Sequence, residues 1–345
     1  MGRSFKTSYG ADMALLQNLW VKIWLALLLL ILATVPFLLT RYQLSILNEI
    51  LIAVIGALGL NLLTGFTGQI SLGHGAFLAI GAYTTALLTG ELGVPFVVSL
   101  PLSGCMAALL GLVVGIPSLR LKGLYLALGT LAFGFIVEYI LFHWDLTQGD
   151  RGLPVPPMSL GGFAADTERE VFLVLTVLAI LAVLAAKNIA RTKIGRSFCA
   201  IRDRDIAAEA MGIPLARYKI MAFGISAFYA GAAGCLVAHY QKWIVPGLFD
   251  LSLSLAYIAM IVLGGLGTIL GSILGALLIS GIPHGITYAV DAFKETHPAL
   301  SGLIVDFKLG IFGLIIVLTL LFEPRGLFGI YQRAKTYWKT WPFRY

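Results

Sequence analysis

The side chains best suited to recognise or move a polar molecule lie in one glycine-rich stretch between apolar runs. From Asn61 to Phe77, amide, hydroxyl and imidazole groups alternate with glycines, a composition that would be costly against lipid. These groups must therefore face protein or a water-filled path. We expect them to line or brace a translocation pathway, with these candidates: Asn61, Gln69, Ser71, His74 and Phe77.

His74, which lies between two glycines, is the most informative of these candidates. Its imidazole could contact a transported molecule directly. A histidine at the start of a helix that bonds to a nearby carbonyl is the more common arrangement, because polar groups in membranes often hold helices together. Gln69 and Ser71 have the same two interpretations.

A second polar feature is a short helix expected within a basic segment, residues 187–219. Asp205 can cap its start by accepting backbone N–H groups, Gly212 can take the left-handed conformation that ends it, and Pro214 prevents its resumption. Small alanines would let a partner protein come close to the backbone, and a glutamate would supply one oriented charge. The helix, of about two turns, is expected to present three residues: Ala207, Ala208 and Glu209.

The sequence contains no nucleotide-binding fingerprint beside these stretches, and its hydrophilic segments are too short to build an enzyme domain. Residues 264–267 lack the Gly-Lys-Ser/Thr ending that would hold phosphates and magnesium, so we expect no ATP site and no cofactor in this chain. The cysteines form no CxxC motif, and we expect no metal site. A polytopic enzyme is the weaker alternative, which clustered acids or histidines at membrane depth would favour.

Membrane-spanning helices are the elements that must position these residues. The chain is 59% hydrophobic and 12% charged, about half the usual charged share of a soluble domain. A helix needs roughly 20 apolar residues to cross a bilayer, and such runs recur along the chain. We predict an all-α polytopic bundle with about ten spans: 24–40, 46–64, 71–89, 96–117, 123–142, 171–186, 219–239, 253–266, 268–287 and 304–322.

The charged residues predict the orientation of these spans. The net charge of +7 is spread over short loops, which indicates membrane topology and no nucleic-acid partner. Basic residues favour the cytoplasmic side, where we place segment 187–219 and both termini; the acidic loop 143–170 is then periplasmic. The chain divides into a cytoplasmic extension, 1–22, a transmembrane domain, 23–322, and a cytoplasmic tail, 323–345.

Glycines mark both close helix packing and breaks. Gly267, Gly271 and Gly275 form a ladder that lets helices approach closely in lipid. Residues 263–267 could be a turn between two spans or a break in one tilted span, and the charge rule favours the turn. A weak internal echo repeats Gly65, Gly68 and Ile70 as Gly264, Gly267 and Ile269, and paired interruptions point to a transport site.

The scarcity of acids and bases at the span centres bears on how transport would be energised. Ion-coupled carriers usually hold ionisable groups at mid-membrane. An ion-coupled secondary amino acid carrier is therefore the runner-up. The sequence fits better a pathway whose energy comes from a partner.

Three stretches together resemble the permease subunits of bacterial high-affinity branched-chain amino acid ABC transporters, the M-type subunit in particular. They are residues 68–77, 195–213 and 262–268, and the similarity covers roughly 45–325. The alanines here precede the glutamate, unlike the Glu-Ala-Ala-x-x-x-Gly order of the older motif. The resemblance implies that the short helix couples the permease to an ATPase, through Asp205, Ala207, Ala208, Glu209 and Gly212.

The resemblance also implies partners and a location. It implies a heteromeric pore with a second, related permease, two cytoplasmic subunits that hold ATP and magnesium, and a periplasmic substrate-binding protein, all at the bacterial inner membrane. Members of the family also carry urea, short amides or aromatic acids. These remain alternatives to branched-chain amino acids as the substrate.

Overall fold

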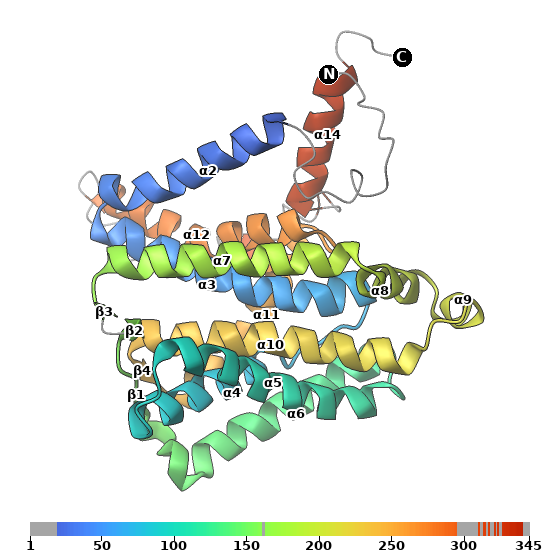
Figure 1. The fold of residues 1–345 in the computed structure, drawn as a ribbon, viewed down its shortest axis with the longest axis horizontal. Coiled ribbons are helices and arrows are strands. Elements are labelled where there is room, and N and C mark those ends of the chain that lie inside the picture. The colour runs from blue at the N-terminus through green and yellow to red at the C-terminus, as the bar shows by residue number, and fades with distance from the viewer. Residues whose placement is uncertain are drawn as a thin grey trace.

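The computed structural model describes residues 19–160, 163–294 and 326–340, with isolated positions between 310 and 323. Most helices lie side by side along one direction (Figure 1). The helices are α2 (Leu19–Leu38), α3 (Arg41–Leu60), α4 (His74–Ala86), α5 (Phe96–Ser118), α6 (Leu124–His143), α7 (Glu168–Arg191), α8 (Lys193–Asp203), α9 (Asp205–Ala210), α10 (Leu215–Gln241), α11 (Leu251–Gly264), α12 (Ile269–Lys294) and α14 (Gly326–Thr340).

Short elements connect these helices. Two π-helical turns, η1 (Asn61–Gly65) and η2 (Leu87–Glu91), extend α3 and α4. Three 3-10 turns are η3 (Asp145–Thr147), η4 (Gly149–Arg151) and η5 (Pro246–Phe249). The four strands are β1 (Leu153–Pro154), β2 (Met158–Leu160), β3 (Phe163–Ala165) and β4 (Trp243–Ile244).

Seven helices among the described residues are long and apolar enough to cross a membrane. The all-α class is confirmed, whereas the count of ten spans is not. The third expected span, 71–89, begins only at His74, and the tenth, 304–322, lies almost wholly outside the described residues, as does most of the extension 1–22. The seven are Arg41–Gly65, Phe96–Ser118, Leu124–His143, Glu168–Arg191, Leu215–Gln241, Pro246–Gly264 and Ile269–Tyr288.

The centre of the bundle is α10, which packs against α3, α4 and α5. Its glycines allow backbones to touch on two sides, because a Cβ on Gly234 would overlap the Leu78 carbonyl of α4 and one on Gly231 would lie 2.7 Å from the Ser103 carbonyl of α5. Close approach of this kind favours helix association where burial of apolar surface gives no driving force.

Helices α11 and α12 form an antiparallel hairpin, so the turn expected at residues 263–267 is present. A Cβ on Gly264 would overlap the Gly271 carbonyl, and one on Gly275 would overlap the Met260 carbonyl. Two rungs of the expected glycine ladder, Gly271 and Gly275, thus lie in the contact between these helices. The third, Gly267, lies in the turn itself with φ +72°.

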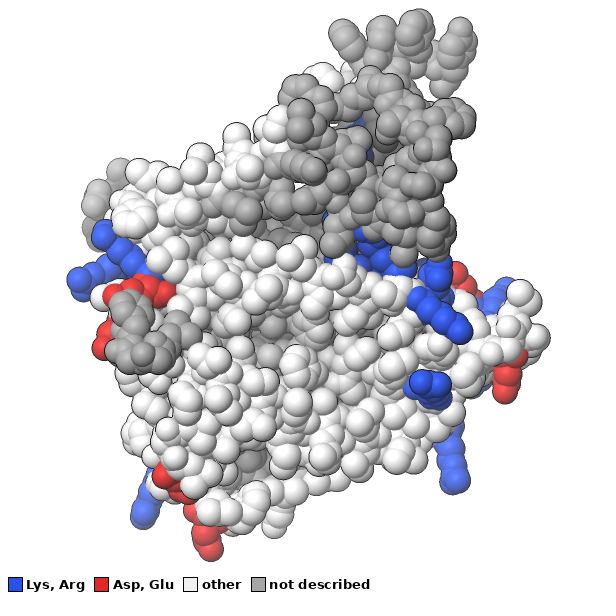
Figure 2. All heavy atoms as spheres, in the orientation of Figure 1, with Lys and Arg blue, Asp and Glu red and all other residues white. Residues whose placement is uncertain are grey.

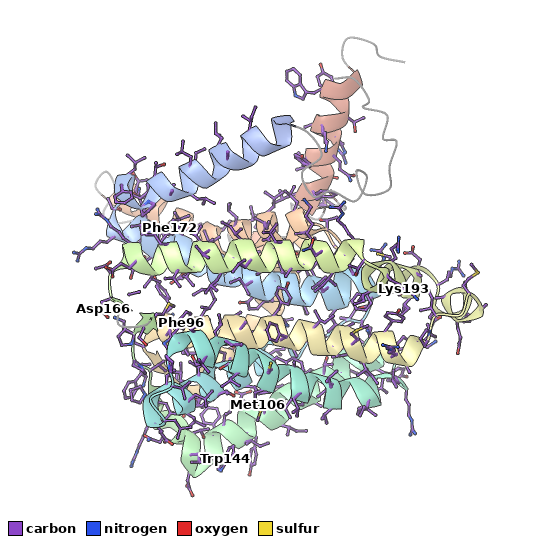
Figure 3. The ribbon with its side chains drawn as sticks, in the orientation of Figure 1. Phe96, Met106, Trp144, Asp166, Phe172 and Lys193 are labelled. Carbon is purple, nitrogen blue, oxygen red and sulfur yellow. The ribbon has the colours of Figure 1, made fainter. Side chains whose placement is uncertain are left out.

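The two ends of the bundle carry the charges. Figure 2 shows blue and red spheres at both ends of the molecule and a broad band without charges between them on the face shown. Figure 3 places Asp166 at one end and Lys193 at the other. The first end holds the small antiparallel pairs β1–β4 and β2–β3, and the second holds α8 and α9.

The basic segment 187–219 is more helical than expected. Helix α7 continues to Arg191, and α8 follows after a single residue, Thr192. Sequence analysis missed α8, although Ile194, Phe198 and Ile201 recur at helical spacing and turn inward: Phe198 is fully buried and Ile201 is 5% exposed. An amphipathic helix therefore lies at the end of the bundle that also holds α9.

Candidate functional site: two helix breaks and the segment before α10

The first break separates η1 from α4. Helix structure ends at Thr67, Gly68 takes φ +73°, and no helix forms until His74. Two threonine hydroxyls bind backbone carbonyls at this break: Thr67 Oγ1 donates to Leu63 O, and Thr64 Oγ1 donates to Gln69 O over 3.0 Å. The polar residues that the sequence places here thus stabilise an interrupted backbone inside the protein.

The second break is the turn between α11 and α12. Gly265 and Gly267 have φ of +123° and +72°, a region that favours glycine, and together they end α11. Thr268 begins the next helix: its hydroxyl donates to Gly265 O over 2.8 Å and accepts from Gly271 N over 3.2 Å. Both breaks therefore combine positive-φ glycines with a threonine that satisfies nearby backbone groups.

Asn61 joins the two breaks. Its Oδ1 accepts from Gly267 N over 2.9 Å, and its Nδ2 donates to Thr268 O over 2.8 Å and to Ser272 Oγ over 2.7 Å. Both amide protons are used and the side chain is 1% exposed. A Cβ on Gly65 would overlap Asn61 Oδ1 and Gly267 N, so only glycine fits there. This geometry indicates that Asn61 braces the helix breaks and does not line an open pathway.

The other pathway candidates are also buried. His74 is the first residue of α4, its Nε2 lies 3.0 Å from Gly56 O, and its ring meets Tyr257 edge-on at 5.1 Å. Phe77 packs on Phe133 with ring centroids 5.2 Å apart. The imidazole therefore has the helix-start, carbonyl-bonded environment that was the alternative to substrate contact, with the carbonyl supplied by α3.

Ser71 and Gln69 differ from these because part of each side chain has no partner. The Ser71 hydroxyl and Gln69 Oε1 are buried without a hydrogen bond, while Gln69 Nε2 donates to Lys219 O over 3.4 Å. Gln69 also borders a hollow of about 260 Å³ at the charged end, beside Lys122, Arg202 and Asp205.

A separate cavity of about 230 Å³ lies between α3, α4, α10, α11 and α12. Its wall is mostly aliphatic, with Ile52, Leu78 and Met260, and Tyr257 reaches it from α11. Glu49 borders it and pairs with His284 over 3.1 Å. The sequence alone could not bring Glu49 and His284 together, because it does not place α12 beside α3.

Helix α9 follows α8 after one residue, Arg204. Asp205 Oδ1 accepts from the N–H of Ile206 over 2.9 Å, and Oδ2 accepts from Lys122 Nζ over 2.6 Å, with Lys219 Nζ 3.9 Å away. The hydrogen bond from Lys122 holds the pKa of Asp205 below its ordinary value. The expectation that Asp205 caps α9 was wrong: the N-cap residue is Arg204, no side chain makes a capping bond there, and Asp205 mainly anchors α9 to the α5–α6 connection.

The exposed face of α9 differs from the expected one. Ala208 is 4% exposed, so the expectation that it is presented to a partner was wrong: α9 turns this position toward the bundle. Ala207 and Glu209 are exposed as expected. Sequence analysis missed Ile206 and Met211, which are 78% and 84% exposed. Six helical residues carry too short a pattern to reveal which face is free.

The end of α9 matches the expectation. Gly212 has φ +82°, its N–H donates to Glu209 O over 2.9 Å, and the N–H of Ile213 donates to Ala208 O over 3.0 Å. These bonds close the helix and satisfy its last carbonyls. The chain then turns at Pro214 into α10.

A family model described as branched-chain amino acid transport system / permease component matches residues 42–320. This chain belongs to that family. The matched range contains both breaks, α8 and α9. The family is one of transport permease components and not of enzymes, which counts against the polytopic-enzyme alternative. Among the described residues, no group of three or more histidines, cysteines and acids could hold a metal ion.

Individual relatives agree with the family. The high-affinity branched-chain amino acid transport system permease protein LivM of Escherichia coli (strain K12) is 36% identical over 272 residues, 72% of this chain and 64% of the relative. The protein of that name from Salmonella typhimurium gives the same values. A probable branched-chain amino acid transport permease protein LivH of Methanocaldococcus jannaschii is 28% identical over 293 residues, 80% of this chain and 88% of the relative.

The matches have limits. The similarity spans less than two thirds of the length of the two permeases matched at 36% identity. No solved structure matches this chain. The permease family is thus established by sequence.

Proposed function

We propose that this protein is a membrane permease subunit of an ABC importer and forms half of a translocation pathway for branched-chain amino acids. Family membership over residues 42–320 supports this reading, because the relatives carry that substrate in their names. The structural observation that carries it is α9, a short anchored helix with two free apolar side chains at one charged end of a polytopic bundle.

The proposed coupling contact is the outer face of α9. Ile206 and Met211 are too exposed to stabilise this chain, and methionine is enriched at protein interfaces. Anchoring of Asp205 by Lys122 fixes the helix before any partner arrives, which lowers the entropy cost of docking. The partner that fits is a cytoplasmic ATPase subunit with an apolar groove.

The remaining partners follow from this assignment. Two cytoplasmic subunits hold ATP and magnesium, and this chain supplies no cofactor. A second, related permease completes the pathway. A periplasmic substrate-binding protein docks at the opposite end, where the β1–β4 and β2–β3 pairs form the surface. In this arrangement the protein lies in the bacterial inner membrane, with both termini and the α8–α9 end in the cytoplasm and about ten spans in total.

The docking experiment uses single substitutions on α9. Ile206→Asp and Met211→Asp should reach the membrane in normal amount but fail to retain the ATPase subunits in a pull-down. Leu266→Asp is the matched control, because Leu266 is also an exposed apolar residue, 48% exposed, but lies in the α11–α12 turn. Normal ATPase retention by both α9 variants would show that α9 is not the docking element.

The substrate is tested separately with the assembled complex. Uptake driven by ATP should be highest for leucine, isoleucine and valine. Preferential uptake of urea, short amides or benzoate would keep the transporter type and change the substrate. Uptake that needs an ion gradient and proceeds without ATP would instead support the secondary carrier.

A further inference from the structure

Arg202 connects the segment before α9 to the first helix break. It lies in the last turn of α8, and its Nη1 donates to Gly65 O over 3.0 Å. Gly65 is the last residue of η1, so this carbonyl belongs to a helix end that lacks regular helical partners. A charged donor on such a carbonyl is a stronger contact than a neutral one.

The same side chain also lies against the second break. A Cβ on Gly267 would be 2.6 Å from Arg202 Nη1 and 2.9 Å from Gly65 O, and a Cβ on Gly68 would be 3.2 Å from Arg202 Cγ. The guanidinium therefore occupies space that glycines leave free. Any side chain at residue 267 would push the guanidinium of Arg202 away from Gly65 O.

The helix that carries Arg202, α8, is joined directly to α9. One residue, Arg204, separates α8 from α9, and Ala208 N donates to Arg204 O over 3.0 Å, so the two helices turn on a single residue. Arg202 Nε also binds Asp203 Oδ1 over 3.1 Å, which orients the guanidinium. A displacement of α8 and α9 together would therefore move Arg202 or break its contact with Gly65.

We propose that Arg202 is a positioning residue that transmits movement of α9 to the paired helix breaks. The inference rests on the proposed function, because it assumes that an ATPase moves α9. Asn61 holds the two breaks to one another, and Arg202 bonds the first of them to the segment that contains α8 and α9. The breaks then shift together when α9 shifts, and α4 and α12, which begin at them, follow.

The test measures coupling rather than assembly. The complex is reconstituted in proteoliposomes with its ATPase subunits and binding protein, and substrate uptake and ATP hydrolysis are measured on the same sample. Arg202→Met should leave the ATPase bound and ATP hydrolysis measurable. The substrate carried per ATP should fall by about tenfold, because losing one hydrogen bond to a charged group changes an equilibrium constant by about that factor. Arg202→Lys, which retains one charged donor, should recover part of the loss.

The matched control is Arg204→Met, an exposed neighbouring arginine with no hydrogen bond or ion pair to the breaks. It should leave substrate per ATP unchanged. A pair of spin labels, at Ala210 on α9 and at Leu266 in the second break, gives a second readout. The distance between the labels should change with nucleotide in step with uptake in the parent, and this change should be lost in Arg202→Met.

The outcomes separate the two proposals. If the parent complex shows ATP-driven uptake and Arg202→Met carries as much substrate per ATP as the parent, Arg202 does not transmit the movement, and the permease assignment stands. If Arg202→Met and Arg202→Lys lose the ATPase entirely, the residue acts in assembly, and the inference fails. If the parent itself neither binds an ATPase nor transports, the proposed function is what has failed.

Discussion

Asn61 Oδ1 lies 2.9 Å from Gly267 N, a hydrogen bond between residues 206 positions apart that closes one helix break onto the other. Backbone groups freed by a break need partners, since few waters are available inside a membrane protein. The first break supplies, through the Asn61 side chain, hydrogen-bond partners for backbone groups of the second break. The repeated glycines that form a weak echo in the sequence are thus neighbours in space.

We expect Asn61→Leu to destabilise the protein strongly. The change removes the acceptor of Gly267 N–H and the donors to Thr268 O and Ser272 Oγ, and leaving buried polar groups unpaired costs about 1–3 kcal/mol each. Unfolding in mixed micelles measures the loss. Asn188→Leu is the control, because Asn188 is exposed on α7. Equal stability of the two variants would contradict the bridging role.

His74→Ala tests whether the imidazole braces the bundle or contacts a passing molecule. The substitution removes the contact between the imidazole and Gly56 O and opens a space beside Tyr257, so we expect a loss of about 2–4 kcal/mol in stability. Uptake should fall with the amount of folded protein. A normal amount of folded protein with lower uptake per molecule would instead show that His74 lines the pathway.

The Asp205–Lys122 pair should make the order of α9 depend on pH. The folded-state pKa of Asp205 is depressed, first by the hydrogen bond from Lys122, so the pair's contribution is fully present above the unfolded-state value of about 3.9. That contribution is lost as pH falls through the lower folded-state pKa. At neutral pH, Asp205→Asn should raise the mobility of a spin label attached at residue 207.

The size of this effect should be small. Lys122 is 70% exposed, and exposed ion pairs contribute about 1 kcal/mol or less. The difference between Asp205→Asn and the parent should shrink in high salt and in strong acid. Glu209→Gln, on the exposed side of α9, is the control and should leave the label unchanged. Equal label mobility in the parent and in Asp205→Asn, in neutral, low-salt buffer, would show that the Asp205–Lys122 pair does not hold α9 in place for docking.

Two glycines of α12 should respond in opposite ways to alanine. A Cβ on Gly275 would overlap the Met260 carbonyl and force α11 away, whereas a Cβ on Gly281 meets nothing within 4 Å. We expect Gly275→Ala to destabilise the hairpin and Gly281→Ala to be neutral or to stabilise by up to about 1 kcal/mol through helix propensity. Thermal unfolding of the purified variants compares them. The same response at both sites would mean that α11 and α12 do not touch at Gly275.

Cysteine labelling tests the proposed orientation. Asp166→Cys and Lys193→Cys would be made singly in a background in which Cys105, Cys199 and Cys235 are replaced. Both positions are exposed and lie at opposite ends of the bundle (Figure 3). In intact spheroplasts, an impermeant thiol reagent should label position 166 only. Labelling of position 193 from outside would invert the proposed topology.

Sequence patterns predicted the parts of this fold that depend on composition. Long apolar runs predicted most helices, and Gly212 and Gly267 were found at turns because positive φ favours glycine. The same reasoning identified the stretch from Asn61 to Phe77 as buried and polar. It could not assign partners within that stretch, since the groups that satisfy Asn61 and His74 come from other helices.

The surface of α9 could not be predicted for a different reason. A helix of six residues has only one or two positions on each face, and its orientation is set by Asp205 and its partner Lys122, far away in sequence. The inward turn of Ala208 and the exposure of Ile206 follow from that anchor. The amphipathic pattern of α8, in contrast, was available in the sequence.

Helix α10 is attached at both ends to the elements proposed to meet partners. At one end, the β4 strand that follows it pairs with β1, Val155 N bonds to Lys242 O over 2.9 Å, and His239 Nδ1 lies 2.8 Å from Pro156 O. At the other, Lys219 O accepts from Gln69 beside the first break. Its 27 residues extend about 40 Å at about 1.5 Å per residue. Because α10 is one continuous helix, a tilt of the loops at one end would also displace the residues at its other end, beside the first break.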